Sequence, residues 1–126
     1  MSYKNLEIWC LARGLSIEIH QMTLNLPQFE MYEEGKQIRK SSKNVRSVIV
    51  EGYGRRYYKQ DFIKFIIYAL ALNMETLDHL EILFETQSFK DEKTYQSLHN
   101  EIEALQIKLN NFLNSVIKNH EGKYGN

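Results

Sequence analysis

The 126-residue chain has the size of one domain, and its 43% hydrophobic content supplies a core and excludes a disordered protein. A single cysteine, Cys10, excludes a disulfide framework and a cysteine-based zinc site. No stretch reaches the roughly 18 apolar residues of a membrane span, and residues 1–24 lack the pattern of a signal peptide. We therefore expect a cytoplasmic protein with no membrane partner.

The charge is balanced in total but uneven along the chain. Sixteen Lys and Arg residues offset 16 Asp and Glu residues. Residues 36–64 contain nine of the basic residues and only two of the acidic ones, a net charge of +7, so the rest of the chain carries −7. This asymmetry indicates a cationic surface in a neutral protein.

Four segments carry the three-and-four spacing of apolar residues that predicts helices. The first spans residues 6–26, with Asn5 as its N-cap and Pro27 as its stop. The second runs from about residue 32–35 to residue 51, where Gly52 and Gly54 end it. The third, about 59–85, is apolar over so wide a face that we expect burial on two sides, within the protein or against another subunit. The fourth, about 91–119, has an unbroken apolar stripe.

Short connections between long helices make neighbours antiparallel, and the three-four spacing favours shallow crossing angles. The sequence therefore predicts an all-α fold, a single-domain antiparallel up-down four-helix bundle over residues 1–126. Residues 120–126 contain two glycines and no apolar stripe, and we expect them to form a frayed tail.

Motifs for catalysis or cofactor binding are missing from the sequence. Di-metal bundles need Glu-x-x-His pairs. The residues three positions before the histidines are Ile17, Thr76, Gln96 and Ile117. Glu75 and His79 share a helix face but supply only two ligands, so a surface pair is the favoured interpretation. Residues 52–56 lack the P-loop pattern, and no histidine has a nucleophile context. We predict no metal, no cofactor and no catalytic residue.

The basic residues of the second helix share one face. At 100° per residue they fall within a sector of about 120°, centred about 130° from the apolar stripe. The predicted nucleic-acid-binding residues are Lys36, Arg39, Lys40, Lys43 and Arg46 from this helix and Arg55, Arg56 and Lys59 from the turn that follows. Tyr57 and Tyr58 are predicted to stack on unpaired bases. The alternatives are a solvated face or one that pairs with the acidic remainder of another subunit.

Several motifs together resemble a known family. They are LEIW at residues 6–9, AR at 12–13, QIRKSS at 37–42, IVEGYGRR at 49–56 and DFIKF at 61–65. Over nearly its whole length the chain resembles the four-helix bundle proteins found in intervening sequences of bacterial 23S ribosomal RNA genes. It departs from the pattern at Ser47-Val48, where many relatives have Ser-Asn, and at Glu33-Glu34, where relatives often have Gly-Leu.

The resemblance implies an up-down bundle that assembles as a homopentamer. It also implies kinship with the accessory variability determinant of diversity-generating retroelements, a basic pentamer that binds nucleic acid and a reverse transcriptase. We predict a non-enzymatic, oligomeric nucleic-acid-binding protein that favours RNA over DNA. The alternative is a protein-interaction scaffold whose basic face meets acidic partners or neighbouring subunits. A polar pocket with strongly perturbed carboxylates would instead favour an enzyme.

Overall fold

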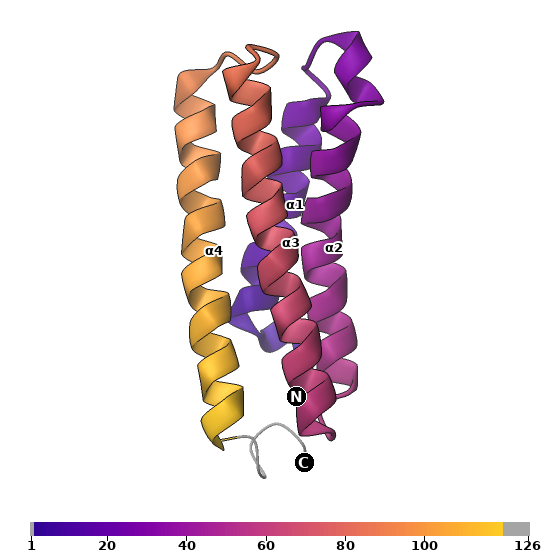
Figure 1. The fold of residues 1–126 in the computed structure, drawn as a ribbon, viewed down its shortest axis with the longest axis vertical. Helices are drawn as coiled ribbons and strands as arrows, with labels where there is room; N and C mark the ends of the chain where they lie inside the picture. The colour runs from indigo at the N-terminus through magenta and orange to yellow at the C-terminus, as the bar shows by residue number, and fades with distance from the viewer. Residues whose placement is uncertain (1, 120–126) are drawn as a thin grey trace.

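The computed structural model describes residues 2–119, which form four long helices and two short 3-10 turns (Figure 1). The elements are η1 (Tyr3–Asn5), α1 (Glu7–Thr23), η2 (Gln28–Met31), α2 (Glu34–Gly54), α3 (Lys59–Glu85) and α4 (Glu92–Asn119). Consecutive helices pack side by side, and α1 also packs on α4, which closes the bundle. The predicted all-α four-helix bundle is confirmed, while the predicted frayed tail at 120–126 lies outside the described residues.

The start and the end of α1 differ from the prediction. Leu6, not Asn5, is the N-cap, and Asn5 belongs to a 3-10 turn that the Ser2 hydroxyl caps by accepting the Lys4 N–H at 3.2 Å. The helix ends at Thr23, three residues before the predicted end at Leu26. The Thr23 hydroxyl donates to the His20 carbonyl (2.8 Å), a local bond that competes with continuation of the helix.

Gly52 lies inside α2, so its predicted role as a helix stop is wrong. The helix continues to Gly54, and a Cβ on Gly52 would lie 2.9 Å from the Cβ of Phe65 on α3. The Ser41 and Thr76 hydroxyls, 2.8 Å apart and buried, join the same two helices. Small residues therefore let α2 and α3 approach closely, and this pair makes the most extensive helix–helix contact in the described chain.

The core follows the apolar stripes of the four helices. One cluster contains Trp9, Val45 and Phe62, and the other contains Ile19 and Leu80. The wide apolar face of α3 is only partly covered, since Ile67 and Met74 remain 47% and 62% exposed. Within residues 2–119, no helix combines the length and the apolar character needed to cross a bilayer.

Candidate nucleic-acid interface

Four predicted binding residues of α2 form a continuous cationic surface, which we call the cationic flank: Lys36, Lys40, Lys43 and Arg46. Lys36 and Lys40 are exposed and make no hydrogen bond or ion pair with another described residue. Lys43 is also exposed, and Arg46 is half-buried. Across residues 2–119, none of the four is in an ion pair with a carboxylate, so no carboxylate of the described chain offsets their charge.

Lys43 and Arg46 lean across the seam between α2 and α1. The Lys43 ammonium lies 3.0 Å from His20 Nδ1, and the Arg46 guanidinium lies 5.3 Å from the centre of the Trp9 ring. Contacts of this kind hold long side chains in place without neutralising them. His20 is therefore part of this surface, although no sequence pattern indicates it.

Arg39 has a structural role in the same helix. Its Nη2 donates to the Met31 carbonyl at 2.6 Å, and the side chain is half-buried. Met31 is the last residue of η2, so this charge-assisted bond ties the connection between α1 and α2 to the helix that follows. The predicted phosphate contact would have to compete with it.

In the turn after α2, the two arginines are engaged within the chain, whereas two tyrosine rings are exposed. Arg55 forms ion pairs with Glu51 (3.1 Å) and Asp61 (3.6 Å). Arg56 donates to the Tyr53 carbonyl (3.1 Å) and lies over the rings of Tyr53 and Tyr57, 4.2 and 5.1 Å from their centres.

The other predicted residues of the turn are less engaged. Tyr57 and Tyr58 are 59% and 73% exposed, and although Arg56 lies over the Tyr57 ring, both residues keep exposed ring surface for stacking. Lys59 is half-buried at the first position of α3. The structure therefore separates the predicted set into a cationic flank on α2, which no carboxylate of the described chain offsets, and a turn whose two arginines are engaged within the chain.

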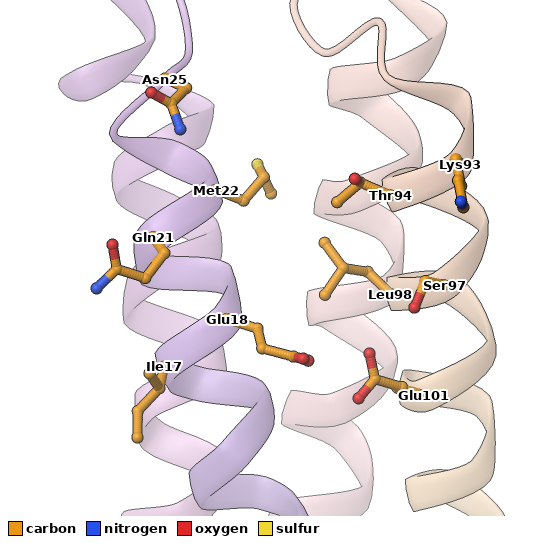
Figure 2. Close-up of a pocket in the computed structure, with 10 residues that line it drawn as sticks. All are labelled: Ile17, Glu18, Gln21, Met22, Asn25, Lys93, Thr94, Ser97, Leu98 and Glu101. Carbon is orange, nitrogen blue, oxygen red and sulfur yellow. The ribbon is translucent and has the colours of Figure 1, made fainter.

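The opposite side of α1 carries a pocket of about 550 Å³ against α4 (Figure 2). Glu18 of α1 and Glu101 of α4 project toward one another across it. Burial, together with the hydrogen bond and the charge of Glu18, raises the pKa of Glu101 from 4.5 to about 7, and a hydrogen bond from Ser97 opposes the shift. The two carboxyl groups therefore share a proton near neutral pH. We call this pair the carboxylate flank.

A perturbed carboxylate in a pocket is what the enzyme hypothesis requires. The pocket has ten lining residues: Ile17, Glu18, Gln21, Met22, Asn25, Lys93, Thr94, Ser97, Leu98 and Glu101. None is a histidine or cysteine, and the pair is engaged with itself. The raised pKa of Glu101 therefore links the packing of α1 against α4 to pH.

Two histidines connect helices through carboxylates. His79 lies 2.7 Å from Glu34 of α2 and 3.4 Å from Glu75, so the predicted surface pair also includes a third, inter-helical partner. His99 of α4 bonds Glu81 of α3 at 2.9 Å. No group of three or more histidine, cysteine or acidic residues within residues 2–119 is arranged to hold a metal ion.

Fold and surface together define a helical bundle with one cationic flank. The family model for the 23S rRNA-intervening sequence protein matches residues 4–111, and the chain belongs to this family. The match includes every predicted binding residue. No curated protein matches the chain. The kinship with the retroelement determinant stays a prediction.

Proposed function

We propose that this protein is a non-enzymatic, cytoplasmic, homo-oligomeric nucleic-acid-binding protein that prefers RNA to DNA. The observation that carries the proposal is the cationic flank, four basic side chains that carboxylates of the described chain leave unneutralised. The chain as a whole has no net charge, so a generally basic composition does not explain this surface.

The physical basis is counterion release. Lysines and arginines that neutralise backbone phosphates release condensed cations, and the affinity then falls steeply with salt, with a slope of about −0.7 per contact for single strands. The exposed rings of Tyr57 and Tyr58 support single-stranded RNA as the ligand, because unpaired bases stack on aromatic side chains.

The homo-oligomer in this proposal is supported by apolar surface at the α3–α4 seam. Ile67 and Met74 of α3 and Ile107 of α4 are 47%, 62% and 62% exposed. Met74 and Ile107 also line one pocket of about 330 Å³ with Leu77 and Ile102. Exposed apolar patches of this kind mark protein–protein contacts, and the homopentamer is the assembly that the family resemblance implies.

The same patch supports the alternative of a protein-interaction scaffold. In that case the cationic flank would meet acidic groups of a partner or a neighbouring subunit, in the way that Arg55 already meets Glu51 and Asp61 within the chain. The two functions differ in what neutralises the flank, which is either phosphate or carboxylate.

The test is charge reversal on two faces. One variant carries Lys36→Glu, Lys40→Glu and Lys43→Glu, and its control carries Lys90→Glu, Lys93→Glu and Lys118→Glu, so both have the same net charge. Fluorescence anisotropy measures the binding of single-stranded RNA, and of DNA of the same sequence, at several salt concentrations.

We expect the first variant to lose about 100-fold in affinity at low salt and to lower the magnitude of the salt slope by about 2, since three phosphate contacts are lost. The control should lose less than fivefold. Equal losses in both variants would mean that net charge, not the cationic flank, governs binding. Unchanged binding by the first variant would favour the scaffold.

A further inference from the structure

A pocket of about 430 Å³ lies between α1 and α2, beside the cationic flank. Its lining residues are Ser16, Ile17, His20, Gln21, Lys43, Arg46 and Ser47. None of the seven is acidic, whereas the pocket on the other side of α1 contains two carboxylates. Two fixed positive charges and a histidine therefore meet in one concave site.

The nitrogen donors of this pocket are held in place. The Lys43 ammonium only donates, so His20 Nδ1 accepts at 3.0 Å and the ring hydrogen lies on Nε2, which is a further donor. Arg46 stacks on Trp9 at 5.3 Å, a contact that orients the guanidinium but uses none of its N–H groups. An orientation fixed before binding lowers the entropy cost of binding an anion.

The hydroxyl groups of the pocket are already engaged. Ser16 donates to the Arg13 carbonyl at 2.7 Å, and Ser47 donates to the Lys43 carbonyl at 3.2 Å. The available donors are therefore charged or nitrogen-based, from Lys43, Arg46, His20 and Gln21. Such a set suits a phosphate group, for which a guanidinium fork and an ammonium are the usual ligands.

We propose that this pocket binds a phosphate monoester, namely the terminal phosphate of an RNA strand. The assignment rests on the proposed function, because Lys36 and Lys40 continue along α2 from the pocket and would contact the next phosphates of the strand. A terminal phosphate carries close to two negative charges, which match the two cations of the pocket, whereas an internal diester carries one.

The first experiment uses the only tryptophan of the chain as a reporter. Arg46 lies over Trp9, so an anion bound at the guanidinium changes the electrostatic environment of the indole. Inorganic phosphate is added to the full chain, and the emission is compared with that in chloride of equal ionic strength. We expect a saturable change with phosphate that is lost in Arg46→Met and reduced in Lys43→Met.

The second experiment compares a short single-stranded RNA with a 5′-phosphate, the same RNA with a 5′-hydroxyl, the same RNA with a 3′-phosphate, and uridine 5′-monophosphate. We expect one of the phosphorylated strands to bind about tenfold more tightly than the unphosphorylated strand. Lys43→Met and Arg46→Met should abolish this preference. Lys93→Met, which removes one positive charge from the first turn of α4, should retain it.

The outcomes separate the pocket from the wider function. If RNA binds but its terminal phosphates make no difference, the pocket assignment is wrong and the proposed function stands. If none of the three RNAs binds while phosphate and uridine 5′-monophosphate still change the Trp9 emission, the pocket binds small phosphate monoesters and the proposed function is wrong. A phosphate response that persists in Arg46→Met would also overturn the assignment.

Discussion

The two sides of α1 differ in both charge and packing. Toward α2, Lys43 and Arg46 contact His20 and Trp9, and no carboxylate lines the pocket between the helices. Toward α4, Glu18 and Glu101 face one another across a larger pocket (Figure 2). The contact between α1 and α4 is also the least extensive of the four between adjacent helices.

This difference shows how a neutral chain can present a directional surface. The pocket toward α2 is lined by two cations and no carboxylate, whereas in the pocket toward α4 the two carboxyl groups lie with one cation, Lys93. An anionic polymer is therefore attracted more strongly to the α2 side. Three properties test this difference: stability after a change in packing, affinity for RNA, and the pH dependence of stability. For each property, one substitution is paired with a matched substitution elsewhere.

The largest expected effect tests the packing part. Gly52→Ala places a Cβ against Phe65 at the close α2–α3 contact, and we expect a loss of about 1–3 kcal/mol in the free energy of unfolding. Gly14→Ala is the matched change. Gly14 shares the α4-facing side of α1 with Glu18, and a Cβ there meets nothing within 4 Å. It should stabilise the protein by about 0.5–1 kcal/mol through helix propensity. Urea denaturation measures the free energy of unfolding of both variants. A loss of stability in Gly14→Ala would show that the α4-facing side of α1 has no room for a Cβ at this position.

The second prediction separates the flank from net charge in RNA binding. Glu51→Lys removes an ion-pair partner of Arg55 and adds a cation near the cationic flank, so we expect affinity to rise about tenfold, or about 1.4 kcal/mol. Glu101→Lys makes the same formal change in α4 and should alter affinity less than twofold. Anisotropy titrations measure the RNA affinity of the two variants and of the wild type at pH 8, where the wild-type Glu101 carboxyl is ionised. Equal gains in the two variants would contradict the comparison.

The third prediction concerns the proton shared at the carboxylate flank. Burial and the neighbouring Glu18 raise the pKa of Glu101 from 4.5 to about 7, so the folded state keeps a proton that the unfolded state releases. Stability should therefore fall as pH rises from about 4.5 to about 7. Glu101→Gln should remove this loss and gain about 1 kcal/mol above pH 7, a value kept small by solvent screening. Urea denaturation from pH 4.5 to 8 measures it, and Glu85→Gln should keep the wild-type profile. A wild-type profile in Glu101→Gln would mean that the two carboxyls do not share a proton.

The smallest expected change in stability comes from the bond between His99 of α4 and Glu81 of α3. The hydrogen bond with Glu81 raises the pKa of His99 above its usual 6.5 and outweighs burial, which lowers it. This bond stabilises the folded state fully below pH 6.5, and the stabilisation is lost as pH rises through the raised folded-state pKa. His99→Gln should lower the melting temperature at pH 5.5 and leave it nearly unchanged at pH 8.5, with an effect of about 0.5–1 kcal/mol. An equal loss at both pH values would point to packing of the ring.

The sequence predicted the helices well because apolar periodicity records which residues the core requires. The bounds of α3, Lys59–Glu85, agree with the prediction, and its surplus apolar face is visible as the exposed Ile67 and Met74. Gly52 was misassigned because a glycine that ends a helix and a glycine that admits a neighbouring helix look the same in one sequence. Only the position of Phe65 distinguishes them.

The candidate site was predictable only in part. A rotation of 100° per residue placed the basic residues of α2 on one face, because this geometry depends on one helix alone. It did not indicate that Arg39 would bond the Met31 carbonyl, that Arg55 would pair with two carboxylates or that His20 would meet Lys43. Contacts between helices depend on how each helix is rotated about its axis. The Glu18–Glu101 pair, which joins α1 to α4, was missed for the same reason.

The central claim is that an RNA strand lies on the cationic flank. The most direct measurement is chemical acetylation of lysines, quantified by mass spectrometry, with and without saturating single-stranded RNA. We expect strong protection of Lys36, Lys40 and Lys43, with Lys90, Lys93 and Lys118 modified at the same rate in both samples. Protection spread evenly over both sets, or confined to the second, would contradict the account.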